Sequence, residues 1–112
     1  MPPHMGSIET LKDTAILTGT VAERRFITLA NAQAGLDAVV KGISAMAGVA
    51  GDAIPYVALG IVDMIAGAEI AAAGPVVSDA NGQPIAKGAN VNVAGLALNA
   101  APLGGRVRIL IR

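Results

Sequence analysis

The chain has 112 residues, a formal net charge of +0 and 54% hydrophobic residues, yet it contains one Tyr, one Phe and no Trp. Its length predicts a single domain, and its high apolar content excludes a disordered chain. A nucleic-acid partner is excluded as well, because nucleic-acid binders carry a basic excess and aromatic side chains that stack on bases. Without cysteine the chain has no disulfide framework, no thiolate metal site and no cysteine nucleophile.

No segment predicts a membrane span or a signal peptide. The longest stretch without a charged residue lies between Lys87 and Arg106 and is interrupted by Asn, Pro and Gly. A spanning helix needs about 20 consecutive, predominantly apolar residues. The N-terminus lacks the basic and apolar blocks of a signal peptide. We therefore predict a protein made in the cytoplasm, with no membrane as partner.

The beginning of the chain predicts a flexible N-terminal arm, residues 1–13, in front of a single β domain, residues 14–112. The arm holds two prolines, and Ile8 and Leu11 are its only large apolar residues after Met5. Such a segment is either a frayed terminus or an extended arm that becomes ordered on a partner.

Alternation and β-branched residues predict strands along most of the remaining chain. The candidate strands are Thr14–Val21, Arg24–Leu29, Val39–Ala45, Ile54–Val62, Val91–Leu98 and Arg106–Arg112. Ile54–Val62 is almost continuously apolar, which predicts a strand covered on both faces, with Pro55 at its beginning or at an unpaired edge position. The last segment is the clearest strand, because Val107, Ile109 and Ile111 fall on one face and its arginines on the other.

Two segments between these strands predict turns of different kinds. Asn81-Gly82 lies between Pro75–Val77 and Pro84–Ala86, and an Asn-Gly pair supplies the positive φ that a tight hairpin needs. The alanine-rich segment Ala66–Gly74 favours at most one short helix, ended by its glycine. The predicted fold class is therefore all-β, a small β-barrel or β-tulip-like domain.

A glycine shortly before a β-branched residue recurs along the chain. It occurs in Gly51–Ile54, in Gly67–Ile70 and in Gly104–Val107. We interpret this recurrence as a repeated turn into a strand rather than as a duplication.

No catalytic constellation is present in the sequence. His4 is the only histidine, and it lies in the predicted arm, where it is not held rigidly against a nucleophile as a catalytic base must be. No phosphate-binding, dinucleotide or metal-ligand spacing occurs. Carboxylates are spread through predicted turns, where capping is their usual role: Asp52, Asp63, Glu69 and Asp79. We predict no enzyme activity, no cofactor and no metal.

Charge is distributed unevenly along the chain. Residues 26–86 hold five acidic residues and one basic residue, whereas residues 87–112 hold four basic residues and no acidic one. The two blocks predict either strands that pair within one subunit or charge complementarity between subunits or with a charged protein lattice.

Motifs of alanine, glycine and β-branched residues follow one another in the C-terminal half: Ala50–Ile54, Leu59–Val62, Ala66–Gly82, Ala94–Leu98 and the terminal strand. Together they resemble the capsid decoration, or cement, proteins of tailed bacteriophages. The resemblance implies a β-barrel or β-tulip that assembles as a homotrimer on the outer surface of the phage head. There it would bridge subunits of the major capsid protein and stabilise the shell, with the virion as its location and no catalytic residue or cofactor.

The same resemblance implies a role for the N-terminal arm, which in many members adds to the capsid surface as an extra strand. In this sequence the capsid-binding residues would be Ile8, Glu9, Thr10, Leu11, Lys12 and Asp13. Main-chain hydrogen bonds would supply the affinity of such a strand.

Two other functions stay open. Gly67–Val77 also resembles the turn-and-strand unit of small β-clip modules that bind carbohydrate-like ligands. Lys41 or Lys87 would be the modified residue of a lipoyl- or biotin-carrying domain, although Val40 and Ile43 beside Lys41 lack the flanking acidic or Met signature of such domains.

Overall fold

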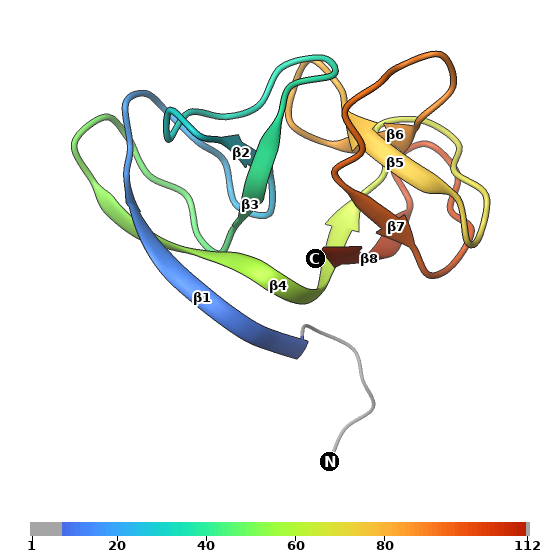
Figure 1. Cartoon of the computed structure of the whole chain (residues 1–112), viewed down its shortest axis with the longest axis horizontal. Coiled ribbons are helices and arrows are strands. Elements are labelled where there is room, and N and C mark those ends of the chain that lie inside the picture. Colours follow the sequence, from blue (N-terminus) through green and yellow to red (C-terminus); the bar gives the residue numbers. More distant parts are fainter. Residues whose placement is uncertain (1–7, 112) are drawn as a thin grey trace.

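Residues 8–111 are described by a computed structural model, in which they form an all-β fold without a helix. The strands are β1 (Ile8–Ile16), β2 (Phe26–Thr28), β3 (Val40–Ser44), β4 (Ala53–Ile65), β5 (Pro75–Ser78), β6 (Pro84–Ala86), β7 (Gly95–Ala97) and β8 (Arg106–Ile111). Figure 1 shows two lobes, one built around β1 to β3 and the other around β5 to β8. The predicted fold class is confirmed.

All strands belong to one antiparallel sheet. Seven of them follow the order β2-β3-β4-β8-β7-β5-β6, and β1 pairs with β4 off this path. The ends of the path nearly meet, because the N–H of Phe26 at the start of β2 donates to the carbonyl of Gly82, just before β6, over 2.9 Å. The sheet is therefore a nearly closed barrel.

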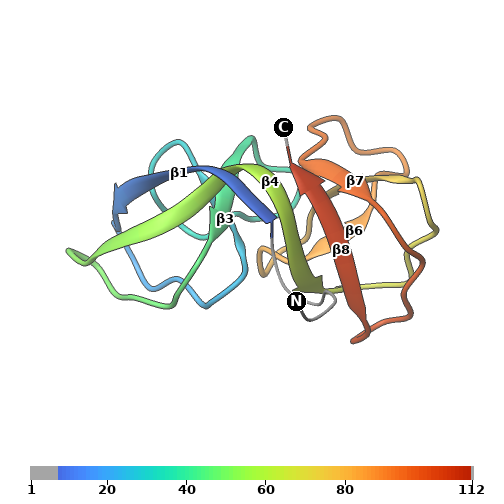
Figure 2. The same cartoon turned by 90° about the horizontal axis from the view of Figure 1, so that it is seen from below.

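Strand β4 connects the two lobes. It is 13 residues long, and Figure 2 shows it running from beside β1 and β3 to beside β8. Buried and more accessible residues alternate along it, except that Tyr56 and Val57 are both buried and the next two residues, Ala58 and Leu59, are both accessible. The prediction that Ile54–Val62 is covered on both faces is thus wrong, since Leu59 and other alternate positions stay accessible. Pro55 does lie near the beginning of the strand, as predicted.

The phase change at Tyr56 and Val57 lets one strand serve two hydrophobic cores. Ile54 and Tyr56 belong to the smaller core, whereas Val57, Val62 and later residues belong to the larger one. Side chains alternate between the two faces of a strand. Tyr56 and Val57 therefore face opposite sides of β4, one toward each core. Directly after them the alternation is interrupted again, where the pairing with β1 shifts its register between Val57 and Leu59.

The two halves of the chain repeat one pattern of backbone hydrogen bonds. In the first half, each bond runs from the N–H of the first residue to the carbonyl of the second: Leu17→Asp52, Gly51→Leu17, Val21→Gly48, Gly48→Val21, Arg24→Ser44 and Ser44→Arg25. The matching bonds of the second half are, in the same order, Ala66→Gly105, Gly104→Ala66, Ile70→Ala101, Ala101→Ile70, Ala73→Ala97 and Ala97→Gly74. Arg24 and Ala73, at matching positions, share a positive φ of 58 and 62°.

Strand pairing follows the same repeat. In the first half of the chain, β1 pairs with β4, β2 with β3 and β3 with β4. The matching pairs of the second half are β4 with β8, β5 with β7 and β7 with β8. We call residues 8–57 the first repeat and residues 58–111 the second repeat. β4 closes the first repeat and opens the second.

Two of the three recurring glycine segments do turn into a strand, as interpreted, and they also belong to this structural repeat. Gly51–Ile54 and Gly104–Val107 lie at matching positions, immediately before and into β4 and β8. The third occurrence, Gly67–Ile70, matches residues 18–21 instead, because Ile70 takes the place of Val21 in its bridge.

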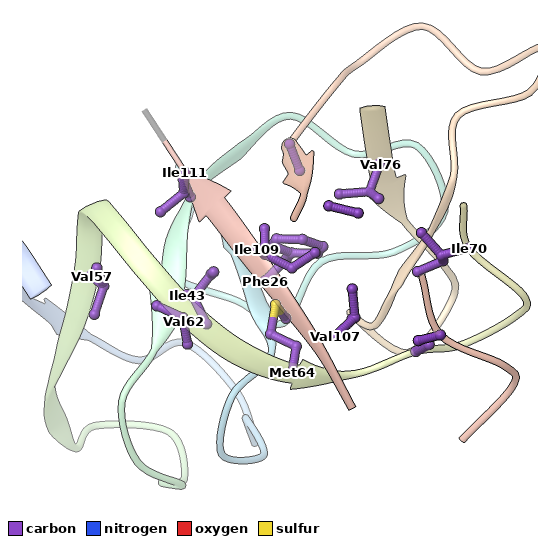
Figure 3. Close-up of a cluster of buried hydrophobic side chains, with 14 of the residues drawn as sticks. Phe26, Ile43, Val57, Val62, Met64, Ile70, Val76, Val107, Ile109 and Ile111 are labelled. Carbon is purple, nitrogen blue, oxygen red and sulfur yellow. The ribbon is translucent and has the colours of Figure 1, made fainter. Parts of the chain in front are cut away.

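Each repeat has its own core. The smaller cluster consists of Ala15, Leu17, Val21, Ile27, Ile54 and Tyr56. Their counterparts are Met64, Ala66, Ile70, Val76, Val107 and Ile109, which all belong to the larger cluster. The larger cluster also contains residues from the boundary between the repeats, among them Phe26, Ile43, Val57, Val62 and Ile111 (Figure 3).

The clearest strand and hairpin predictions are confirmed. In β8, Val107, Ile109 and Ile111 are buried. β5 and β6 form the predicted hairpin, with a φ of 75° at Gly82. Asp79 caps its turn, since the Oδ1 atom accepts the N–H groups of Asn81 and Gln83 over 2.7 and 2.9 Å. Other predicted strands are shorter in the structure, such as Val91–Leu98, of which only Gly95–Ala97 forms β7.

Ala66–Gly74, where the sequence favoured at most one short helix, forms none in the structure. Ile70 exchanges two backbone hydrogen bonds with Ala101, and its side chain is only 2% exposed. Burial of an isoleucine contributes about 1.5–3 kcal/mol, whereas the helix propensity of alanine amounts to tenths of a kcal/mol per residue, about 0–0.7. Long-range burial therefore outweighs the local preference.

Candidate functional site

The predicted capsid-binding residues lie in β1. Ile8, Glu9, Thr10, Leu11, Lys12 and Asp13 run antiparallel to β4, with register shifts on both sides of Leu11. The predicted boundary between residues 13 and 14 therefore falls inside a strand. Residues 1–7, the remainder of the predicted arm, lie outside the described residues.

Strand β1 leaves one edge free within residues 8–111. It pairs with β4 alone, so the outward N–H and C=O groups face no other strand of the described chain. Ile8 and Leu11 on this strand are 58% and 54% exposed. An exposed apolar edge strand is a template for pairing with another chain.

A tyrosine and an aspartate connect β1 to the smaller core. The hydroxyl of Tyr56 donates to Oδ2 of Asp13 over 3.3 Å, and the Oδ1 atom of Asp13 accepts the N–H of Thr14 over 2.8 Å. The Lys41 ammonium lies 4.7 Å from the centroid of the Tyr56 ring and donates to Oδ1 of Asn31. The hydrogen bond between Tyr56 and Asp13 thus shows whether the C-terminal end of the predicted arm is paired with β4.

Burial raises the pKa of the Tyr56 hydroxyl above its ordinary value of 10.0, and the negative charge and hydrogen bond of Asp13 raise that pKa further. A tyrosine pKa that is higher in the folded state contributes stability below about pH 10, which is lost as the pH rises through the folded value. We expect Asp13→Asn to lower the Tyr56 pKa. Because Tyr56 is the only tyrosine, the ultraviolet absorbance of its phenolate measures this pKa directly.

The Lys12→Gln variant is the control for that titration, since it removes a neighbouring charge of opposite sign without touching the Tyr56 hydrogen bond. An unchanged Tyr56 pKa in Asp13→Asn would show that residues 8–13 do not stay on β4 in solution.

Of the carboxylates predicted to lie in turns, Asp52 and Asp79 cap turns, whereas Asp63 lies within β4, so the prediction is wrong for this residue. Asp52 Oδ2 accepts the N–H of Val49 over 2.9 Å. Asp63 and Arg108 form an ion pair with 3.4 Å between Oδ1 and Nε. This pair joins the acidic middle of the chain to its basic end within one subunit.

No candidate catalytic or metal centre is present among residues 8–111. No group of three or more His, Asp or Glu residues in this part of the chain is placed to hold a metal ion. A hollow of about 280 Å³ is lined by Glu23, Arg24, Asp63, Met64, Ile65 and Arg106. Ligand pockets commonly measure about 300–1,000 Å³, so this hollow is small for one. No helix of the described chain is long and apolar enough to cross a membrane.

An exposed apolar surface that the sequence analysis missed lies on the second repeat. Its centre is a hollow of about 170 Å³ lined by Pro75, Val93, Ala94, Gly95, Leu96 and Leu110. We call this surface the tail face. Its residues come from β5, the segment before β7, β7 and β8, so only the paired sheet brings them together.

Comparison with known proteins finds a similar fold. No protein-family model and no curated protein matches the chain. Among solved structures, the crystal structure of the head fiber gp8.5 N base of bacteriophage phi29 matches with a TM-score of 0.73 and 18% sequence identity. The match covers 91% of this chain and 93% of that chain. The two chains thus share their fold over nearly their whole lengths.

Proposed function

We propose that this chain is a structural protein of a bacteriophage head. It binds the outer surface of the capsid, bridges subunits of the major capsid protein and thereby stabilises the shell. The observation that carries this proposal is the fold shared with the phi29 head fiber base over 91% of the chain. The location that follows is the virion, and the proposed role requires neither a cofactor nor an enzymatic reaction.

The contact proposed for the capsid is the free edge of β1. A capsid segment that pairs with this edge would gain main-chain hydrogen bonds and cover Ile8 and Leu11, which are exposed. A homotrimer would present three such edges, and several linked contacts can raise the overall affinity by about 10²–10⁴-fold. Binding only to the assembled shell stabilises that shell by mass action.

Co-sedimentation of the purified chain with tailed-phage shells tests this function. We expect the chain to pellet with expanded shells and to remain in the supernatant with unexpanded ones, because cementing requires the lattice of the mature head. We expect Leu11→Asp to reduce the bound fraction at least tenfold, since a carboxylate would be desolvated in the contact.

The matched control is Leu103→Asp, which makes the same change at an exposed position on the turn before β8. Absence of the wild-type chain from both pellets would contradict the capsid role. Equal binding of the Leu11 variant and the wild type would remove β1 as the contact while leaving the capsid role in place.

A further inference from the structure

The turn between β5 and β6 joins the second repeat to the first. Gly82 on this turn is buried, and its carbonyl accepts the N–H of Phe26 over 2.9 Å. The carbonyl of the preceding residue, Asn81, accepts Nη1 of Arg25 over 2.7 Å. A Cβ at Gly82 would lie 3.2 Å from the Cβ of Arg25 and 3.3 Å from the carbonyl oxygen of Phe26. The main chain at residues 81 and 82 thus lies directly against the start of β2, and the closure of the barrel depends on its path.

Asparagine side chains are thermolabile, and the residue that follows an asparagine decides how fast it reacts. The backbone nitrogen of that residue attacks the carboxamide carbon, and a side chain on the attacking residue obstructs the approach. Glycine has no Cβ and leaves the approach open. Asn81 is the only asparagine of the chain that is followed by glycine, since the others precede Ala or Val: Asn31, Asn90, Asn92 and Asn99.

The structure separates Asn81 from three of these asparagines by the freedom of its side chain. Asn81 is exposed, and its carboxamide makes no hydrogen bond within residues 8–111. Three other carboxamides are held by hydrogen bonds, those of Asn31, Asn92 and Asn99. A carboxamide must rotate until its carbon faces the following nitrogen before it reacts. Asn81 can make this rotation without losing a hydrogen bond.

Asn90 differs from Asn81 in the attacking group. Its carboxamide makes no hydrogen bond within the described chain either, but the next residue is Val91, whose β-branched side chain is stiff and crowds its own nitrogen. The N–H of Val91 is also held by the Asp37 carboxylate over 3.0 Å. At Asn81 the attacking N–H of Gly82 donates to a carbonyl of the turn over 3.2 Å, the long end of the ordinary range. Asn81 therefore combines a freely rotating carboxamide with a weakly held, unobstructed nitrogen.

We propose that Asn81 is a modification site, at which the folded chain loses ammonia and converts this residue to aspartate and isoaspartate. The Gly82 nitrogen gives its proton to solvent and bonds to the carboxamide carbon, while the carboxamide nitrogen takes up a proton and leaves as ammonia. Water then opens the resulting cyclic imide. Attack of water on the side-chain carbonyl carbon gives aspartate in a normal backbone, and attack on the main-chain carbonyl carbon gives isoaspartate. The reaction consumes water alone and needs no enzyme.

Isoaspartate would change the path of the main chain where the barrel closes. Its peptide bond runs through the former side chain, so one additional carbon lies between the Cα of residue 81 and the nitrogen of Gly82. The former main-chain carbonyl, which Arg25 contacts, becomes a carboxylate. The Gly82 carbonyl is thereby displaced from the N–H of Phe26, and this hydrogen bond weakens. Aspartate instead keeps the backbone and adds one charge at an exposed position.

Peptide mapping of aged protein tests the site. The purified, folded chain is incubated in mildly alkaline buffer and cleaved after Lys and Arg, which places Asn81 in the peptide 42–87 without another asparagine. We expect this peptide to gain the mass difference between a hydroxyl and an amino group at least about tenfold faster than the peptides that hold the other asparagines. Asn81→Ser keeps a residue that turns accept, and its peptide should keep its mass, which excludes a reaction at Gln83.

Amide hydrogen exchange at Phe26 tests the effect on the barrel. The isoaspartate form, identified by enzymatic methylation of its carboxylate, is separated from the aged sample. Asn81→Asp is the matched control, because it carries the same charge on an unchanged backbone. We expect Phe26 to exchange at least about tenfold faster in the isoaspartate form than in the wild type, since local opening sets the exchange rate, and Asn81→Asp to exchange as the wild type does.

An unchanged mass of the peptide 42–87 from the folded chain would overturn the modification site. This holds even if the chain unfolded in urea reacts, because the turn would then shield Gly82. Equal rates at Asn81 and at another asparagine would overturn the site as well. Isoaspartate without faster exchange at Phe26 would overturn the effect on barrel closure. No measurement uses phage shells, so these outcomes are independent of the proposed capsid role.

Discussion

The Phe26→Ala variant is expected to lose about 3–5 kcal/mol of unfolding free energy, the usual cost of truncating a buried phenylalanine. Phe26 is the only phenylalanine of the chain and is 0% exposed. It lies where the two repeats meet, so a cavity there weakens the packing of both lobes. Because the unfolding free energy of a whole domain is only about 5–15 kcal/mol, this loss is a large part of the total stability.

Urea denaturation followed by circular dichroism measures this loss. Leu103→Ala is the matched control, because the exposed leucine should change the unfolding free energy by no more than about 0.5 kcal/mol. A Phe26→Ala loss as small as the control's would mean that the boundary between the repeats contributes little to the fold.

Gly42→Ala and Gly95→Ala are expected to destabilise the protein by about 1–3 kcal/mol each or more, through overpacking. The two glycines occupy matching positions in β3 and β7. A Cβ at Gly42 would lie 2.6 Å from the carbonyl oxygen of Val57 and in contact with the Tyr56 ring. A Cβ at Gly95 would lie 2.8 Å from the carbonyl oxygen of Leu110. A carbonyl oxygen in a paired strand has no room to move away.

Gly19→Ala is the control for both glycine variants. No atom lies within 4 Å of a Cβ at Gly19, and this residue is not among those with a positive φ. Replacement there should be neutral or stabilise the fold by up to about 1 kcal/mol, since alanine restricts the unfolded chain. If Gly95→Ala matched this control while Gly42→Ala did not, the two repeats would differ in how closely β7 and β3 approach their neighbours.

The shared strand explains why one sequence motif was misread. A strand that serves a single core shows regular alternation, which is what the arginines and aliphatic residues of β8 display. In β4 the alternation is broken twice in succession, because Tyr56 and Val57 are both buried and Ala58 and Leu59 are both accessible. All four residues are apolar, so the sequence shows a nearly unbroken apolar run. From sequence alone such a run is the same as that of a strand covered on both faces.

The two candidate surfaces, the exposed edge of β1 and the tail face, also differ in whether the sequence reveals them. The exposed residues of β1 were singled out from the sequence, because a weakly apolar segment in front of a strand-rich domain is a local feature. The tail face was missed, since Pro75, Leu96 and Leu110 become neighbours only when β5, β7 and β8 pair. Val93 was visible as part of a strand candidate, but nothing in its sequence context marks it as uncovered.

Local sequence patterns were sufficient to predict the all-β class, the terminal strand and the hairpin at Asn81-Gly82, because period-two alternation and positive φ are properties of neighbouring residues. Long-range contacts were needed to show that Ile70 pairs with Ala101, that the chain repeats its hydrogen-bond pattern across β4, and that one repeat covers the next. Those features depend on contacts between distant residues, whose burial energy exceeds local propensity. The low aromatic content and the balanced charge of the chain are compatible with many β folds, and long-range pairing selected this one.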